Sequence, residues 1–286
     1  MRNCSSGQPI CVRAYSVLLV LAVSLYGLSV AAAEVDDALR AAIAGSQRTP
    51  DFVARDGARH PYETLSFFGI RPDMTVIEIW PGGGWYTEIL APYLRDRGKL
   101  YAAHFSADAE LKYFRELRGT FLHKIAAAPA LYDKVEVTEF DPPRAVAIAP
   151  PGSADLVLTF RNVHNWTMRG GGEERTLAAF KALYAALRPG GILGVVDHRL
   201  PANRPLSDQE ESGYLREDFV IDMAERVGFQ LVAKSEINAN PKDHADHPEG
   251  VWSLPPSLRG DAARRDHYLA IGESDRMTLK FIKPTR

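Results

Sequence analysis

The chain has 286 residues, of which 46% are apolar and 24% charged, and its formal net charge is -2. This size and balance fit one large α/β domain or two small ones. Because the sequence has neither an excess nor a block of basic residues, a nucleic-acid substrate has no electrostatic support.

The first 33 residues differ in composition from the rest of the chain. Two arginines and no acid accompany an almost wholly apolar run from Ala14 to Val30, and small residues follow before Glu34. This pattern predicts a secretory signal peptide, residues 1–33, that is cleaved after Ala33. The product would be exported, periplasmic and without stable membrane insertion. The alternative is an uncleaved anchor through residues 14–30, which are near the lower limit for a membrane span.

Both cysteines of the sequence, Cys4 and Cys11, fall within the predicted signal peptide. After cleavage the protein would contain no cysteine. The sequence therefore predicts neither a disulfide nor thiol chemistry in the exported chain.

A short helical segment is predicted before the first strand. Apolar residues recur at helical spacing from Val35 to Ile43, and Gly45 ends the pattern. The polar stretch that follows carries Arg55, Arg59 and Glu63. One interpretation of this stretch is a solvated helix face.

The most informative stretch is the strand and turn at residues 73–87. An apolar run around Glu78 predicts a buried parallel strand, and Gly82, Gly83 and Gly84 follow where such a strand turns into a helix. Glycine lets the backbone bend sharply and lets a ligand approach without meeting a Cβ, while the next helix presents free N–H groups. The stretch therefore predicts a ligand-binding turn, with a simple tight connection as the alternative.

The spacing of the glycines argues against a nicotinamide dinucleotide. That fingerprint requires Gly-x-Gly-x-x-Gly, but counting from Gly82 gives Gly84 and then Thr87. An acid at Glu78, four residues before Gly82, fits better a ligand that carries an ammonium group or ribose hydroxyls.

Strands and helices alternate along the rest of the chain. Strands are predicted at residues 98–103, 135–140, 154–160 and 192–196, and helices at 86–94, 108–117, 173–187 and 217–227, with a turn at 188–191. This alternation implies a parallel sheet covered by helices on both faces. Two late strands, 229–235 and 277–282, have no predicted helix between them and should pair antiparallel. A long loop at about 236–275 joins them, and such loops are usually functional or disordered.

Several of these stretches resemble the class I S-adenosylmethionine-dependent methyltransferases. Residues 78–84, Glu-Ile-Trp-Pro-Gly-Gly-Gly, are similar to motif I of that family, with Trp80 in place of its first glycine. Asp141 follows the third strand where the family places an acid against the adenine, and residues 187–197 look like another signature of the family. The resemblance is strongest to a bacterial subgroup of predicted methyltransferases with a Trp-Pro-Gly-Gly-Gly turn and, often, a signal peptide.

The resemblance implies a Rossmann-like α/β fold with a mostly parallel seven-stranded sheet and an antiparallel last strand. It implies a methyltransferase domain at 73–286, an N-terminal helical lid at 34–72, and S-adenosyl-L-methionine as cofactor. The cofactor-binding residues expected from it are Glu78, Gly82, Gly83, Gly84, His104, Asp141 and Asn162. His104 is a departure, because the family usually ends its second strand with an acid that holds the ribose hydroxyls.

Candidate catalytic residues follow the fourth and fifth predicted strands, because ligands of open α/β sheets bind beyond the carboxyl ends of the strands. His164 and His198 are candidate bases, and Asp197 could orient either one. Residues 161–165 fall where the family places the groups nearest the transferred methyl. The alternative for each histidine is a pocket residue that makes one hydrogen bond.

A metal site formed by the three histidines His104, His164 and His198 together with Asp197 is disfavoured, because these residues come from separate loops without a short ligand pair. The sequence thus predicts methyl transfer from S-adenosylmethionine to an unidentified small-molecule acceptor. The alternative function is an exported, non-catalytic binding module on the same fold. Neither the acceptor nor the oligomeric state follows from the sequence.

Overall fold

The computed structural model describes residues 36–285. The predicted signal peptide (1–33), the alternative anchor (14–30) and both cysteines lie outside this range. No helix within residues 36–285 is long and apolar enough to cross a membrane.

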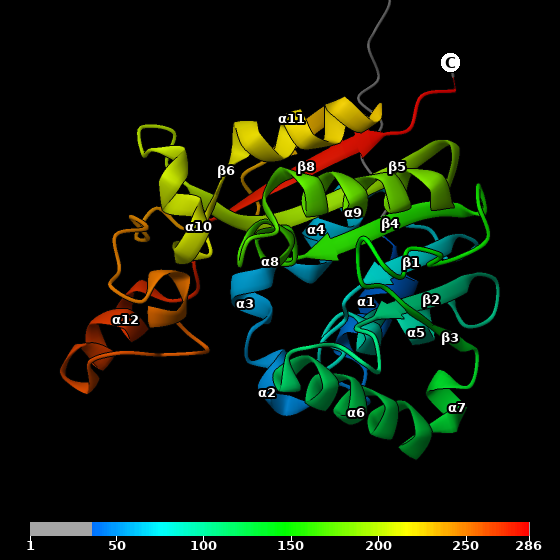
Figure 1. Cartoon of the computed structure of the whole chain (residues 1–286). Helices are drawn as coiled ribbons and strands as arrows, with labels where there is room; N and C mark the ends of the chain where they lie inside the picture. Colours follow the sequence, from blue (N-terminus) through cyan, green and yellow to red (C-terminus); the bar gives the residue numbers. More distant parts are fainter. Residues whose placement is uncertain (1–35, 286) are drawn as a thin grey trace, which may run out of the picture. The chain divides into compact units, whose positions relative to one another are not determined.

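A single mixed sheet organises the described chain (Figure 1). Its strand order is β3-β2-β1-β4-β5-β8-β7; the first five of these strands are parallel, and β8 is antiparallel to both β5 and β7. The bounds are β1 Thr75–Ile79, β2 Lys99–His104, β3 Val135–Glu139, β4 Ala154–Phe160, β5 Leu187–Leu200, β7 Gln230–Ser235 and β8 Arg276–Ile282. The predicted seven-stranded sheet with its antiparallel last strand is confirmed. A short strand, β6 (Leu215–Arg216), also pairs with β5, and its two residues are too few for a period-2 pattern.

Helices cover both faces of the sheet (Figure 1). They are α1 Asp37–Ala44, α2 Pro50–Val53, α3 Asp56–Arg59, α4 Pro61–Phe68, α5 Thr87–Leu94, α6 Lys112–Ala127, α7 Pro129–Tyr132, α8 Val163–Thr167, α9 Gly172–Ala186, α10 Gln209–Ser212, α11 Glu217–Val227 and α12 Arg265–Ile271. One face packs against α9 and α11, and the opposite face packs against α1, α4 and α5.

The alternation of apolar side chains along the central strands builds these two cores. In β1, Ile77 and Ile79 belong to the core beneath α9 and α11, while Val76 belongs to the core with α1, α4 and α5. In β4, Val157 belongs to the core beneath α9 and α11, and Leu156 belongs to the core with α1, α4 and α5. Neighbouring strand residues point to opposite faces, so a continuous apolar run is what a strand buried on both sides requires.

The second predicted helix differs from the structure at both ends. We expected residues 108–117, but α6 begins at Lys112 and continues to Ala127. The guanidinium of Arg115 donates to the carbonyls of Ala109 and Glu110, which keeps the residues before α6 in a turn. The helix ends before Pro129, because proline disfavours the helical conformation of the residue that precedes it.

The fifth strand is much longer than predicted. The expected turn at 188–191 is part of β5, and Gly190 and Gly191 are tied to Lys283 by backbone hydrogen bonds. At its other end β5 extends beyond β4, because β8 pairs with it as far as His198. Asp197 and His198 are therefore strand residues and not loop residues.

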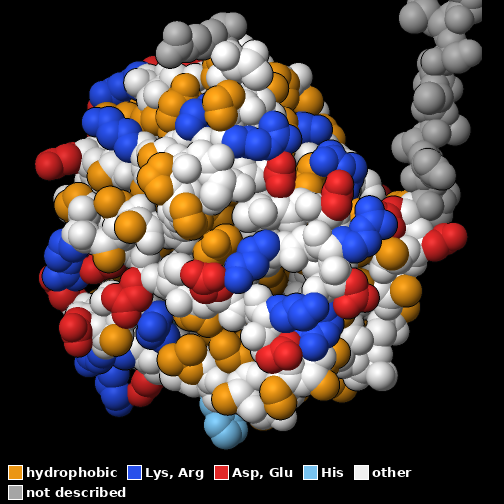
Figure 2. All heavy atoms as spheres, turned by 90° about the vertical axis from the view of Figure 1, so that its right-hand side faces the viewer, with side chains coloured by type: hydrophobic (Ala, Val, Ile, Leu, Met, Phe, Trp, Pro, Cys, Tyr) orange, Lys and Arg blue, Asp and Glu red, His pale blue; other side chains and the backbone are white. Residues whose placement is uncertain are grey.

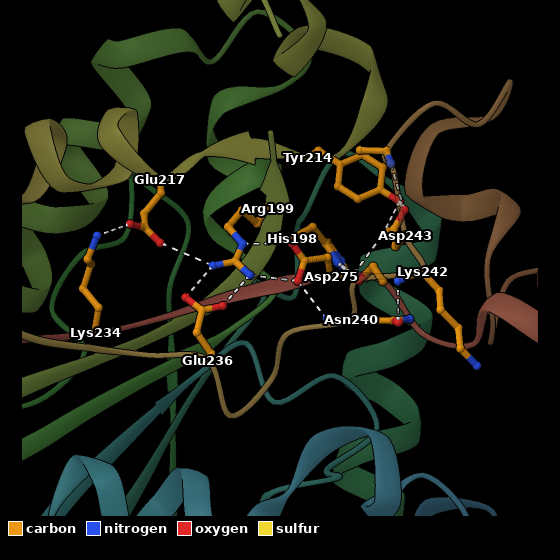
Figure 3. Close-up of polar contacts among 12 residues, drawn as sticks. His198, Arg199, Tyr214, Glu217, Lys234, Glu236, Asn240, Lys242, Asp243 and Asp275 are labelled. Carbon is orange, nitrogen blue, oxygen red and sulfur yellow. Dashed lines mark hydrogen bonds and ion pairs between the residues drawn. The ribbon is translucent and has the colours of Figure 1, made fainter. Parts of the chain in front are cut away.

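The long connection from 236 to 275 is ordered by polar contacts (Figure 3). Arg199 of β5 pairs with Asp275 and Glu236, which lie at the two ends of this segment. The Asp243 carboxylate accepts hydrogen bonds from the Tyr214 hydroxyl and from the backbone N–H of Asp275. The segment contains α12 and two short 3-10 turns.

Charged side chains are mixed on the face of the molecule shown in Figure 2. Lysines and arginines alternate there with aspartates and glutamates, and apolar side chains lie between them. This face therefore carries no broad field of one sign.

Candidate functional site

A cavity of about 620 Å³ opens at the carboxyl ends of β1, β4 and β5. This volume lies in the range of small-molecule sites, which is about 300–1,000 Å³. The lining includes Phe52, Arg55, Arg59, Glu78, Trp80, Gly82, Gly83, Tyr86, Phe105, Phe114, Phe160, Arg161, Asn162, His164, Asn165, His198, Trp252, Glu273 and Ser274. Residues from the N-terminal helices, four strand ends and the 236–275 segment thus meet at one site.

The glycine turn forms one wall of this cavity. Gly82 and Gly84 have φ angles of 60° and 90°, which glycine adopts without steric cost. A Cβ on Gly82 would meet no atom of residues 36–285 within 4 Å, so the backbone there borders open space. A Cβ on Gly84 would instead lie 3.4 Å from the ring of Phe121, and Gly84 does not line the cavity. Gly82 and Gly83 are therefore the residues of this turn that a ligand can approach.

Trp80 replaces a glycine in the motif and still adopts a left-handed backbone, with φ of 45°. Its indole N–H donates to the Phe140 carbonyl at 2.7 Å, and its ring packs against Phe105 and Trp166. These contacts hold a conformation that costs a non-glycine residue about 1–2 kcal/mol. The bulky side chain thus supports the same turn from the side of the core.

His104 lies beneath the glycine turn and not in the cavity. It is fully buried, its Nε2 is 3.0 Å from the Gly82 carbonyl, and its Nδ1 accepts the Phe105 N–H at 2.8 Å. The Nε2–H therefore donates to the turn. Burial lowers the pKa of His104 to about 4, with the Gly82 hydrogen bond opposing this effect, so the ring is neutral at pH 7. The structure gives His104 the role of fixing Gly82.

Glu78 lines the cavity at the end of β1 and is 2% exposed. Its carboxyl group accepts the Thr87 hydroxyl at 2.6 Å. Burial raises the pKa of Glu78 to about 7, and the Thr87 hydrogen bond acts in the opposite direction. A carboxyl group poised near neutrality can donate or accept hydrogen bonds with a polar ligand.

Two other predicted cofactor residues lie differently. The amide of Asn162 donates to the Ile79 carbonyl at 2.7 Å, and Asn162 lines the cavity between β1 and β4. Asp141 forms an ion pair with Arg144 outside the cavity lining. The structure thus brings Asn162 to the end of β1 and leaves Asp141 outside the cavity lining.

The predicted catalytic residues converge. His164 Nδ1 lies 2.8 Å from Asp197 Oδ1, and the His164 backbone N–H is 3.3 Å from Asp197 Oδ2. Asp197 is fully buried, and it lies behind His164, which lines the cavity. The carboxylate therefore orients the ring with Nδ1–H toward Asp197. The other nitrogen, Nε2, accepts from the Asn165 amide at 3.0 Å.

His198 completes this group from the neighbouring strand. Its ring centre is 5.1 Å from that of His164, and its Nδ1 is 2.5 Å from the Ser274 hydroxyl. Burial, together with nearby His164 and Arg161, lowers the pKa of His198 well below its usual value. His198 is therefore a neutral hydrogen-bonding residue of the lining at pH 7.

Three of the four residues considered as metal ligands come together. One ligand atom each from His164, Asp197 and His198 lies within 4.8 Å of the others, but His104 is part of the glycine turn. The guanidinium groups of Arg161, Arg276 and Arg59 lie near His198, and their positive charge disfavours a metal cation at this position. The arrangement fits an oriented base better than a metal site.

An arginine cluster that the sequence pattern does not predict lies at the same end of the cavity. Arg55 and Arg59, interpreted as part of a solvated face, line the cavity with Arg161, and Arg59 is only 3% exposed. Burial, and then the charge of Arg161, lowers the pKa of Arg59 well below its usual value. The solvated interpretation is therefore wrong for these two residues, because the chain folds back over the sheet. The periodicity of the sequence does not predict that Arg55 and Arg59 contact the cavity.

Glu273, just before β8, and Arg276, at the start of β8, complete the arginine cluster. The Glu273 carboxylate accepts from Arg55 at 2.6 Å and from Arg276 at 3.1 Å. Burial opposes its ionisation, but the charges of Arg59, Arg276, Arg161 and Arg55 outweigh burial and lower its pKa to about 2. Glu273 is therefore ionised throughout the physiological range.

No family model and no curated protein matches the sequence. Solved structures do match the fold. A S-adenosylmethionine-dependent methyltransferase from Aquifex aeolicus has a TM-score of 0.51 at 19% identity, over 65% of this chain and 87% of that one. A candidate sarcosine dimethylglycine methyltransferase from Galdieria sulphuraria has a TM-score of 0.53 at 12% identity, over 82% and 85%.

A third similar structure is the [4+2]-cyclase SpnF, with a TM-score of 0.51 at 15% identity, over 80% of this chain and 81% of that one. At these identities the likeness concerns the fold and leaves the reaction open. The strand order, the antiparallel β8 and the position of the glycine turn agree with this likeness. The chain therefore has the Rossmann-like fold of the class I S-adenosylmethionine-dependent methyltransferases.

Proposed function

We propose that the protein transfers a methyl group from S-adenosylmethionine to a small-molecule acceptor. The observation that carries this proposal is that the glycine turn and the His164–Asp197 pair open on one cavity. A donor site and an oriented base are the two parts that such a reaction requires.

The residues at the glycine turn fit the donor. Gly82 borders open space, so its backbone can approach a ligand closely. Glu78 offers a carboxyl group to hydroxyl or ammonium groups, and the stacked rings of Phe105 and Phe114, 4.1 Å apart, offer an apolar wall for a flat base. S-adenosylmethionine, when bound, supplies a methyl group already activated by its sulfonium. The protein then has to align the acceptor and take its proton.

His164 is the proposed base. Asp197 fixes the tautomer in which Nε2 carries the lone pair, and Nε2 belongs to a residue of the cavity lining. An acceptor hydroxyl, thiol or ammonium group that displaces the Asn165 amide would give its proton to this nitrogen. The adjacent Asp197 carboxylate stabilises the imidazolium that forms.

Calorimetry and an activity screen test the proposal in sequence. Full-length protein should bind S-adenosylhomocysteine, and a labelled donor should then transfer its methyl group to one of a panel of small phenols, thiols, amines and carboxylates. If S-adenosylhomocysteine does not bind, the donor assignment fails. If it binds but no acceptor, including those in a native envelope extract, is labelled, catalysis is the part that fails.

A non-catalytic binding module is the second candidate function. It is favoured by the absence of a carboxylate at the end of β2, where His104 supports the turn and does not line the cavity. The fold also carries other reactions, since SpnF is described as a cyclase. Tight binding of S-adenosylhomocysteine without any transfer would select this function.

We also propose that residues 1–33 are a signal peptide and that the protein is exported. The apolar run from Ala14 to Val30 and the small residues at 31–33 support this proposal. Export raises the question of donor supply, because S-adenosylmethionine is a cytosolic metabolite. An uncleaved anchor with the enzyme in the cytosol is the alternative that would remove this difficulty.

A further inference from the structure

The end of the cavity beside His164 carries excess positive charge. Arg59 reaches this end from α3, and Arg55 reaches it from the residue before α3. Arg161 directly follows β4, and Arg276 begins β8. Their charges act on His198 and on one another across this end of the cavity.

Two carboxylates, Glu273 and Asp197, face the four guanidinium groups of this arginine cluster. Four positive and two negative charges leave an excess of two. Asp197 is moreover engaged by His164. Residues 36–285 therefore do not neutralise the cluster by themselves.

Several guanidinium nitrogens of the cluster also have no hydrogen-bond partner among residues 36–285. These are Nε and Nη2 of Arg59, Nη2 of Arg55 and Nε of Arg276, all of them buried. Arg59 Nε lies 3.5 Å from Glu273 without forming a hydrogen bond. A buried donor without a partner costs about 1–3 kcal/mol. Such donors indicate a ligand that accepts hydrogen bonds.

Arg161 is the arginine best placed to meet that ligand. It lines the cavity, is half-buried, and makes no side-chain ion pair within the described part of the chain. Its backbone is left-handed, with φ of 62°, held by the N–H of Arg161 donating to the Val196 carbonyl at 2.7 Å. Non-glycine residues in this conformation cluster at ligand sites, where the surrounding structure maintains the strain.

We propose that this arginine cluster binds an anionic group, a carboxylate or a phosphate, of the methyl acceptor. The planar guanidinium fork matches both groups with two parallel hydrogen bonds. The inference rests on the proposed function, in which His164 takes a proton from the same molecule. The acceptor is then a small acid that carries a second, methylatable group.

The charge of the cluster favours the acceptor over the donor as its ligand. S-adenosylmethionine carries one carboxylate, one ammonium and one sulfonium group, so its net charge is positive and the cluster repels it. The glycine turn follows β1, whereas Arg161 of the cluster follows the neighbouring strand β4 and Arg276 begins β8.

Matched probes test the charge requirement in full-length protein. Calorimetry should compare 4-hydroxybenzoate and 4-hydroxyphenyl phosphate with the neutral 4-hydroxybenzamide, each with and without S-adenosylhomocysteine. At least one anion should bind tenfold or more tightly than the amide, and this preference should weaken as salt rises. The stronger of the two anions identifies carboxylate or phosphate as the group.

Arg161→Gln should reduce the preference for the anion over 4-hydroxybenzamide to less than threefold, whereas Arg161→Lys should retain part of this preference. Arg71→Gln, an exposed arginine outside the cavity, should leave it unchanged. Arg161→Gln removes one of several like charges, so its thermal unfolding temperature should not fall. Equal binding of anions and amide, or a preference that survives Arg161→Gln, overturns the proposal.

The carboxylate of the methyl donor is the alternative ligand of the arginine cluster. A second comparison distinguishes it from an anionic group of the acceptor. 5′-Methylthioadenosine lacks the amino-acid part of S-adenosylhomocysteine. If Arg161→Gln weakens S-adenosylhomocysteine tenfold but leaves 5′-methylthioadenosine unchanged, the cluster holds the donor and the inference is wrong. If neither nucleoside binds while anions are still preferred, the methyl-transfer proposal fails and the anion site stands.

Discussion

At the scale of single residues, two of the six non-glycine residues with a left-handed backbone among residues 36–285 directly follow strands of the sheet. Trp80 follows β1 and Arg161 follows β4, and both have a left-handed backbone, with φ of 45° and 62°. Trp80 is held by its indole hydrogen bond and by aromatic packing. Arg161 lacks such support from its side chain and faces the cavity. The first residue thus maintains the turn, whereas the second is available to a ligand.

Replacing Gly82 should weaken donor binding more than it weakens the fold. In Gly82→Ala, the Cβ meets no protein atom within 4 Å, so the folded state loses only about 1–2 kcal/mol from the left-handed backbone. Calorimetry should show S-adenosylhomocysteine binding reduced tenfold or more. Gly152→Ala is the matched control, since Gly152 has φ of 68°, an equally open Cβ position and no place in the cavity. Wild-type affinity in Gly82→Ala would contradict the assignment of the turn.

Replacing His164 should slow transfer without changing donor affinity. His164→Ala removes the proposed base, and general base catalysis contributes roughly a hundredfold or more to the rate. Once an acceptor is identified, kcat should fall by that factor while the Kd of S-adenosylhomocysteine changes less than threefold. His198→Ala provides the comparison within the same cavity. Should His198→Ala and not His164→Ala abolish transfer, the base is His198.

At the scale of elements, Glu78 at the junction of β1 and α5 should make the free energy of unfolding depend on pH. Burial raises the pKa of Glu78 to about 7 from 4.5, so the folded chain holds the proton more tightly than the unfolded chain. The stability that Glu78 contributes is complete below pH 4.5 and is lost as pH rises to about 7.

Glu78→Gln has no proton to lose. The unfolding free energy of the wild type relative to this variant should therefore fall by about 3 kcal/mol between pH 4.5 and 7, as measured by urea denaturation. The exposed Glu110→Gln should show no such trend. A constant difference between wild type and Glu78→Gln would mean that the folded-state pKa is not raised.

The contact between α3 and β8 depends on Glu273. Removing its charge leaves the surrounding guanidinium groups without their shared partner, so Glu273→Gln should destabilise the protein by about 3 kcal/mol. Chemical denaturation should show that adding Arg161→Gln restores part of this loss, because a like charge is removed. Glu173→Gln, from an exposed pair with Arg226, should cost less than about 1 kcal/mol. No effect of Glu273→Gln would refute the charge balance described for the cluster.

At the scale of the whole molecule, the cavity unites parts of the chain that lie far apart in sequence. Phe52 and Arg59 precede the sheet, His164 lies in α8, His198 lies in β5, and Trp252 lies in the long segment before β8. The polar contacts shown in Figure 3 hold both ends of that segment against β5. A change in this segment can therefore alter the site without altering the sheet.

Processing of the chain is the prediction at this scale. The small residues at 31–33 predict cleavage after Ala33, so N-terminal sequencing of the native protein should begin at or near Glu34. Fractionation should recover this form from the periplasm. Recovery of residues 1–33 on membrane-bound protein would instead favour the anchor and a cytosolic domain.

The central strands β1 and β4 and the glycine turn were predictable from local sequence, whereas β6 and the full length of β5 were not. The apolar runs of β1 and β4 are buried on both faces, and the three glycines follow β1, so the strand pattern and the turn are both local properties of the sequence. The same pattern placed His164 and Asp197 at neighbouring strand ends, since parallel strands end at one edge of the sheet.

The tertiary structure alone decided what these residues face. His104 and Asp141 have plausible positions in the sequence, but the fold turns His104 under Gly82 and pairs Asp141 with Arg144. Arg59 has the composition of a surface residue and becomes buried because α3 folds against the start of β8. The contacts of Arg55 and Arg59 with Glu273 join residues more than 200 positions apart, and no periodicity records them, so the charge of the cavity emerges only when the chain is folded.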